Sequence, residues 1–159
     1  MFEVSSKIKS FALLLLIVCC ATTVALSQNR QKYGKNIKLF YGENGIQVVA
    51  VQVGSPENNE FLVKISGDDF PLNGVIEKHK LVDTSSSATS RLDYVKKVNG
   101  EDYTTMYFRN GNGWVYIVNA AGEGREYRVY GPETINDEES AKSLYLEYLG
   151  QQEDASNTN

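Results

Sequence analysis

The single histidine of the chain, His79, is the first residue to consider for acid–base chemistry. A Ser–His–acid device would need His79 as its base and one of the serines within 85–90 as its nucleophile. None of these serines stands in a Gly-x-Ser-x-Gly sequence, the tight turn that exposes a nucleophile in many hydrolases. Because His79 alternates with Lys78 and Lys80, we interpret it as a surface or half-buried strand residue.

Acidic residues could support hydrolysis or bind calcium. A glycosidase needs two carboxylates, and Asp68, Glu77 and Asp93 are candidates, but a chain with 20 acidic residues contains many such pairs. Asp68 and Asp69 lie in a turn-rich stretch at 66–74, where oxygen ligands could converge on calcium. That stretch lacks the Asp-x-Asp spacing and terminal glutamate of a dedicated calcium loop. We therefore predict no enzyme activity, no metal and no cofactor.

The N-terminal segment has the three regions of an export signal. Lys7 and Lys9 precede an apolar run at 11–18, and Ala25-Leu26-Ser27 places small residues where a signal peptidase needs them. These features predict a signal peptide at 1–27, cleavage before Gln28, and a secreted or periplasmic protein.

Two alternatives would keep the chain at a membrane. An uncleaved anchor would use 11–26, which is shorter than the roughly 20 apolar residues of a spanning helix. A lipoprotein would be modified at Cys19 or Cys20, yet neither follows the small residue that such signals carry. Both cysteines lie in this segment, so the exported part has no thiolate for zinc and no disulfide. The net charge of −4 argues against nucleic acid as a partner.

The rest of the chain is typical of an antiparallel β protein. After a polar leader at 28–36, branched and aromatic runs alternate with glycine and asparagine turns, which predicts one β-rich domain at 37–150 with a sandwich or barrel-like sheet. We expect about eight strands, at 37–41, 46–53, 60–66, 75–82, 92–98, 103–109, 114–118 and 125–130.

Turn lengths predict the register of the later strands. A two-residue Asn99-Gly100 turn places Lys97 opposite Asp102, and a four-residue loop at 110–113 places Tyr107 opposite Tyr116. One face would then carry Leu92, Tyr94, Tyr103, Tyr107, Trp114, Tyr116, Val118, Tyr127 and Val129. We interpret this aromatic face as the core, and a ligand-binding surface is the alternative.

The C-terminal part predicts a helix. Pro132 should end the last strand, Asn136 or Asp137 can cap the helix, and Gly150 should end it. Its apolar stripe consists of Ala141, Leu144, Tyr145 and Tyr148, and we expect this stripe to pack on Met106, Phe108, Val115 and Ile117. The polar tail at 151–159 is predicted to be disordered.

These features favour an exported, non-catalytic binding protein of the cell envelope that recognises another macromolecule, as an inhibitor, immunity or accessory factor. The candidate binding residues are Asp68, Asp69, Phe70, Ser85, Ser86, Asn110, Asn112 and Trp114. A glycan- or small-ligand-binding β-domain is the first alternative, and a small secreted hydrolase is the second.

Overall fold

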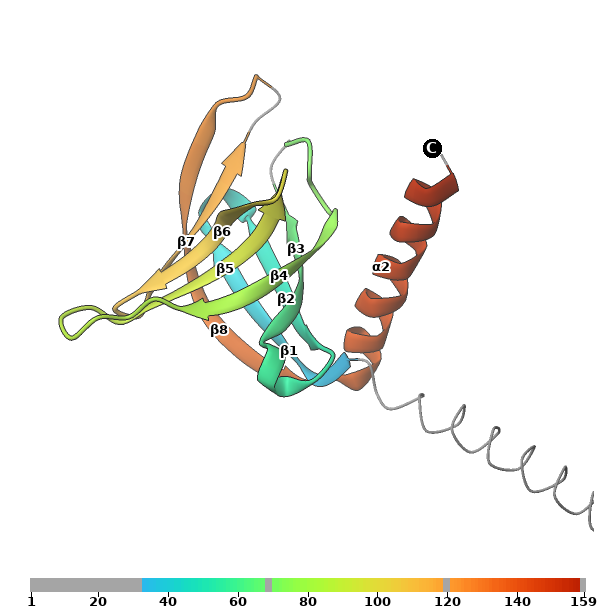
Figure 1. The fold of residues 1–159 in the computed structure, drawn as a ribbon, viewed down its shortest axis with the longest axis horizontal. Coiled ribbons are helices and arrows are strands. Elements are labelled where there is room, and N and C mark those ends of the chain that lie inside the picture. The colour runs from blue at the N-terminus through green and yellow to red at the C-terminus, as the bar shows by residue number, and fades with distance from the viewer. Residues whose placement is uncertain (1–32, 68–69, 119–120, 158–159) are drawn as a thin grey trace, which may run out of the picture. The chain divides into compact units, whose positions relative to one another are not determined.

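The computed structural model describes residues 33–67, 70–118 and 121–157. Within them, eight antiparallel strands form a closed barrel in which each strand pairs with its neighbours in sequence and the last pairs with the first (Figure 1). The strands are β1 (Tyr33–Gly42), β2 (Gln47–Val53), β3 (Glu60–Ser66), β4 (Ile76–Asp83), β5 (Arg91–Val98), β6 (Glu101–Arg109), β7 (Asn112–Val118) and β8 (Gly124–Asn136). Short 3-10 turns, η1 (Glu43–Gly45) and η2 (Pro56–Asn58), follow β1 and β2, and α2 (Glu138–Asn157) follows β8. The expected antiparallel, barrel-like sheet with one C-terminal helix packed on it is confirmed.

The barrel interior is filled with side chains. Strands turn alternate residues inward, as expected for a period of two, and the buried cluster consists of Phe40, Ile46, Val48, Ala50, Phe61, Val63, Ile65, Phe70, Tyr94, Met106, Val115, Ile117 and Val129. An eight-stranded barrel is just wide enough for such filling.

A second buried cluster lies outside the barrel, beneath α2. Ala141 and Leu144 of the helix pack on outward-facing residues of the first four strands, namely Ile37, Val51, Val53, Leu62 and Ile76. β2 is therefore buried on both faces, which explains its unbroken run from Val48 to Val51. The predicted helix stripe is confirmed, but its predicted partners are wrong, because Met106, Phe108, Val115 and Ile117 face the barrel interior.

A bulge in β6 explains why the faces of β6 and β7 differ from the expectation, and the register of β7 with β8 explains why Val129 does not follow Trp114. Lys97 lies opposite Asp102 as expected, but the register shifts between Tyr94 and Val95, where Thr105 is the extra residue of β6. Because one inserted residue exchanges the two faces of a strand, the predicted aromatic face is divided between inside and outside. Tyr94 and Val129 lie in the core, whereas Tyr107, Trp114 and Tyr116 turn outward.

The turn after β6 is also shorter than expected. Asn110 and Gly111 both have positive φ, at 50° and 78°, and form a two-residue hairpin turn. Tyr107 consequently pairs with Trp114 rather than with Tyr116.

β8 does not end at Pro132 but bends there and continues to Asn136. The bend coincides with a register shift against β1, between Leu39 and Tyr41, where proline can be accommodated. Gly131 is required at this bend, because its φ is 121° and a Cβ would lie 2.8 Å from the carbonyl oxygen of Leu39.

The structured segment is longer than expected at both ends. β1 begins at Tyr33, inside the predicted leader at 28–36, while the predicted signal peptide lies outside the described residues. Asp137 caps α2 by accepting hydrogen bonds from the amide and hydroxyl of Ser140, at 3.0 and 2.6 Å. The helix then continues through Gly150 to Asn157, so residues 151–157 of the predicted disordered tail are helical. The side chain of Gln151 holds this last part by accepting a hydrogen bond from the amide of Ile76 at 3.1 Å.

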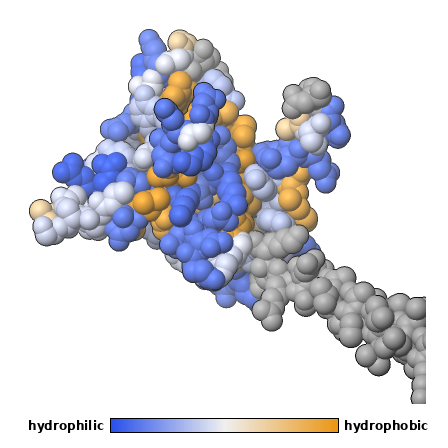
Figure 2. Space-filling view, in the orientation of Figure 1, coloured by the Kyte–Doolittle hydropathy of each residue, from blue (hydrophilic) through white to orange (hydrophobic). Residues whose placement is uncertain are grey.

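No helix in the described part of the chain is both long and apolar enough to cross a membrane. The surface seen in Figure 2 is mostly hydrophilic, with hydrophobic patches over the barrel and on α2.

His79 is a polar residue of the barrel interior, 2 % exposed, rather than the surface or half-buried residue that its flanking lysines suggested. Its Nδ1 lies 3.1 Å from the carbonyl oxygen of Glu77, which can only accept, so Nδ1 carries the proton. Its Nε2 then accepts a hydrogen bond from the hydroxyl of Thr105 at 2.9 Å. Both ring nitrogens are satisfied in the neutral form.

We expect the helix contact to contribute strongly to stability. Leu144→Ala should lower the free energy of unfolding by about 2–5 kcal/mol, because it leaves a cavity between α2 and the barrel. Leu146→Ala is the matched control: its side chain is 54 % exposed, and it should cost less than about 0.5 kcal/mol. Urea denaturation followed by circular dichroism measures both. Equal losses would show that the helix is not held by this contact.

We also expect stability to fall in mild acid because of His79. Burial lowers the pKa of His79 from 6.5 to about 4. The unfolded state therefore binds the proton first, and the free energy of unfolding decreases as the pH falls from about 6.5 to about 4, by about 3 kcal/mol at most. The single imidazole gives one NMR titration curve, whose midpoint should lie near 4. His79→Gln should reduce the loss of stability over this pH range, and a midpoint near 6.5 would contradict the buried position.

Candidate functional site

The outer face of β5–β8 carries a concentration of arginine and aromatic side chains. We call it the Arg–aromatic face and define it as Arg91, Asp93, Tyr107, Arg109, Asn112, Trp114, Arg128 and Tyr130. Cross-strand pairing builds it in two adjacent rows. In one row, Asp93 pairs with Tyr107, Tyr107 with Trp114, and Trp114 with Arg128. In the other row, Arg91 pairs with Arg109, and Arg109 pairs with Asn112.

Planar groups stand side by side along these rows. The rings of Tyr107 and Trp114 are stacked, with centroids 5.2 Å apart and an interplanar angle of 19°. The guanidinium of Arg91 lies 4.5 Å from the centroid of Tyr107, and that of Arg128 lies 5.3 Å from the centroid of Tyr130. Tyr107 is thus held between an arginine from β5 and a tryptophan from β7.

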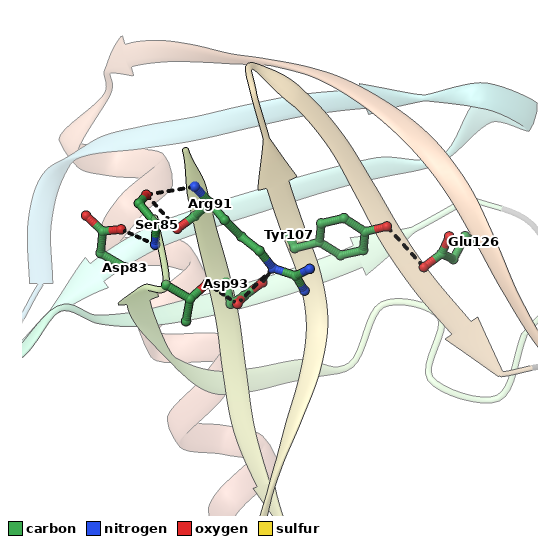
Figure 3. A network of polar contacts seen from close by, with 7 residues as sticks. Asp83, Ser85, Arg91, Asp93, Tyr107 and Glu126 are labelled. Atoms are coloured by element: carbon green, nitrogen blue, oxygen red, sulfur yellow. Dashed lines mark hydrogen bonds and ion pairs between the residues drawn. The ribbon is translucent and has the colours of Figure 1, made fainter. Parts of the chain in front are cut away.

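A buried carboxylate fixes the arginine end of this arrangement. Arg91 Nε donates to both oxygens of Asp93, at 2.9 and 3.2 Å, and the hydroxyl of Thr84 donates to Asp93 at 2.7 Å (Figure 3). The side chain of Asp93 is only 8 % exposed although it points outward, because Arg91 and Thr84 cover it. A carboxylate with this many donors is a rigid support for the guanidinium.

Further hydrogen bonds hold the loop between β4 and β5 against this support. The hydroxyl of Ser85 accepts from the amide of Arg91 at 2.7 Å, and the amide of Ser85 donates to Asp83 at 2.9 Å (Figure 3). Hydrogen bonds from Ser85 lower the pKa of Asp83. At the end of the same loop, Ser90 and Asn110 exchange two bonds, so the loop and the turn between β6 and β7 form one connected edge.

The Arg–aromatic face is positive although the chain is acidic. It has three arginines and one aspartate, while the whole chain has a net charge of −4. Arg91 lies directly opposite Arg109, a like-charge pairing that is unfavourable in a sheet unless something offsets it. Asp93 neutralises Arg91, whereas Arg109 stays exposed. Arg128 donates to Asn112 Oδ1 at 2.7 Å, which is a neutral partner.

The far side of the face has its own acidic contact. The hydroxyl of Tyr107 donates to Glu126 at 3.2 Å (Figure 3). Partial desolvation and the nearby carboxylate of Glu126 raise the pKa of Tyr107. The ring is therefore held at both its face and its hydroxyl.

The structure gathers most of the predicted binding residues in this region. Ser85 lies in the loop that supports Arg91, Ser86 bridges to Thr89 in the same loop, and Asn110 belongs to the connected edge. Asn112 and Trp114 are members of the Arg–aromatic face. Phe70 is not: it is 8 % exposed and packs into the opposite end of the barrel. Asp68 and Asp69 lie outside the described residues.

Sequence reasoning missed the arginines and Tyr107. The predicted aromatic face assigns Tyr107 to the core, because the sequence pattern does not show the bulge at Thr105. The three arginines are not among the predicted binding residues. The available signal was the alternation of arginine with apolar residues near the ends of three strands.

The described residues do not assemble the catalytic or metal sites considered above. His79 is buried inside the barrel, whereas Ser85 and Ser86 lie in an exposed loop. Glu77 binds Lys96, while Asp93 binds Arg91 on the outer face. No three His, Cys, Asp or Glu side chains in the described ranges converge as a metal would require.

Comparison with known proteins returned no match: no family model, no curated protein and no solved structure matches this chain.

The buried position of Asp93 predicts a large difference from an exposed aspartate on the neighbouring strand. Asp93→Asn should lower the free energy of unfolding by about 1–3 kcal/mol, since it removes charge-assisted bonds to Arg91 and Thr84. Asp102→Asn, in an ion pair with Lys97 that is 68 % exposed on both sides, should cost less than about 0.5 kcal/mol. Urea denaturation measures the free energy of unfolding of both variants. Similar losses would mean that the carboxylate of Asp93 is solvated.

Proposed function

We propose that the protein binds an acidic segment of another protein through the Arg–aromatic face, as an exported, non-catalytic component of the cell envelope. The observation that carries this proposal is the combination of three arginines with stacked Tyr107 and Trp114 on one outward sheet face.

The composition of this face supports a protein partner. Interface centres are enriched in tyrosine, tryptophan and arginine and depleted in lysine and glutamate. The Arg–aromatic face contains no lysine, and the glutamate at its edge, Glu126, is hydrogen-bonded to Tyr107. Tyr130 and the adjacent Tyr41, its partner on β1, are 52 % and 47 % exposed and extend the aromatic surface. Large aromatic side chains left exposed in this way supply contact area at a low entropy cost.

The positive charge of the face supports an acidic partner. Asp93 neutralises Arg91, whereas Arg109 beside it is exposed, so Arg109 is the guanidinium that a carboxylate from a partner would meet. Guanidinium groups bind carboxylates through two parallel hydrogen bonds, which adds geometric selectivity.

A glycan is a weaker alternative on the same residues. Sugars stack on exposed ring faces, but Tyr107 has Trp114 on one side and Arg91 on the other. Tyr107 therefore presents mainly its edge to a partner, which suits protein side chains better than flat stacking.

We expect binding to depend on Arg109 and Trp114. The full chain, used as bait on envelope and extracellular fractions of the source cells, should retain a protein whose dissociation constant surface plasmon resonance then measures. Arg109→Glu should weaken binding at least about tenfold and reduce its dependence on salt. Trp114→Ala should weaken it at least about tenfold by removing the central aromatic contact.

The matched control is Lys142→Glu, which makes the same charge change at an exposed position of α2. It should leave the dissociation constant unchanged. If Arg109→Glu and Lys142→Glu bind equally well, the Arg–aromatic face is not the binding surface.

A further inference from the structure

A second candidate site lies inside the barrel at the end where β3, β5 and β7 finish, drawn uppermost in Figure 1. It is a pocket of about 200 Å³. Its inner wall is apolar and consists of Val63, Ile65, Phe70 and Ile117. An apolar cavity of about 150 Å³ holds one benzene molecule, so the pocket has room for one substituted ring.

The pocket exists because β6 and β7 separate at this end. Among the described residues, their pairing runs from Arg109 and Asn112 to Met106 and Val115. Both strands stay paired with their other neighbours beyond that point, β6 as far as Glu101 and β7 as far as Val118. The rings of Tyr103 and Tyr116 stand across this separation, with centroids 6.1 Å apart. Both rings line the pocket.

One wall of the pocket carries an ion pair. Lys96 Nζ donates to both carboxylate oxygens of Glu77, at 2.8 and 2.7 Å, and both residues line the pocket. The side chains are 13 % and 27 % exposed, so the pair is largely removed from bulk water. Its charges cancel, and each partner keeps hydrogen-bonding capacity for a further neutral group.

Thr105 adds an acceptor to the same wall. Its hydroxyl hydrogen is committed to His79 Nε2, because Nδ1 of that ring holds the ring proton. Thr105 lines the pocket, and its oxygen can then only accept a further hydrogen bond. Together, the wall offers a donor from Lys96 and acceptors from Glu77 and Thr105, the set that a single hydroxyl group can satisfy.

Apolar side chains surround the entrance. Leu72, Val75, Val98 and Val118 all line the pocket, and each stays 38–46 % exposed. Exposed hydrophobic residues gathered around a concave site are typical of a surface that a ligand covers.

We infer that this pocket binds an uncharged, ring-sized apolar molecule that carries a hydroxyl group, with the hydroxyl directed to Lys96, Glu77 and Thr105 and the ring placed against Phe70 and Ile117. Because the charges of Lys96 and Glu77 cancel, a charged ligand would gain no net attraction to offset the loss of its own hydration, so neutral ligands are favoured over anions and cations. This site is separate from the Arg–aromatic face and does not depend on it.

Four matched probes test this inference: 4-ethylphenol, ethylbenzene, 4-ethylbenzoate and 4-ethylbenzylamine. NMR titration of the full chain should show 4-ethylphenol shifting the amides of Val98, Tyr103 and Ile117. It should bind about fivefold tighter than ethylbenzene, the effect of roughly one net hydrogen bond, and at least about tenfold tighter than either charged probe.

Variants that remove one charge of the ion pair sharpen the test. Lys96→Met leaves the carboxylate of Glu77 unpaired and should improve binding of 4-ethylbenzylamine about tenfold, whereas Glu77→Gln should do the same for 4-ethylbenzoate. Lys97→Met is the matched control, because Lys97 pairs with Asp102 at an exposed site outside the pocket, and it should change no affinity.

Several results would overturn the inference. They are equal binding of 4-ethylphenol and ethylbenzene, amide shifts away from the pocket, or no binding of any probe. The ranking of the four probe affinities for the unmodified chain tests the inference even if a charge-removing variant fails to fold.

Discussion

Closure of the barrel through β1 and β8 is the constraint on which the rest of the structure depends. An open eight-stranded sheet would leave two edges with unpaired amides and carbonyls, whereas this pairing removes both. The pairing extends to Asn36 and Asn136 only because β8 bends at Gly131, where no larger residue would fit beside Leu39. The same extension delivers the chain to Asp137, which begins α2 against the outside of the barrel.

The two candidate sites follow from departures from regular pairing. The bulge at Thr105 turns Tyr107 outward, where it stacks with Trp114, and turns Met106 inward. Beyond that bulge, β6 no longer follows β7, and the space between them becomes the pocket. One extra residue in a single strand therefore contributes to both the outer surface and the inner cavity.

Much of the fold could be predicted, because its signals are local. Alternating branched and aromatic residues, together with Asn-Gly turns, identified all eight strands and the hairpin order, and the spacing of Ala141 and Leu144 identified the buried stripe of the helix. The face on which that stripe packs could not be predicted, since both sides of β2 are apolar and periodicity does not say which side meets a helix. Of the candidate binding residues, Asn112 and Trp114 fall on the Arg–aromatic face, whereas Phe70 lines the pocket at the end of the barrel.

By itself, the sequence determined the eight strands, the helix and its cap, and the acidic net charge. It also determined that the chain has a single histidine, which lies in a strand. Only the tertiary structure decided which aromatic residues are core and which are surface, because a single bulge reverses the faces of β6 without leaving a mark in the local pattern. It also decided that His79 is a buried, neutral part of the interior and that Lys96 meets Glu77, since side chains 26 and 19 positions apart come together only through the pairing and curvature of the strands.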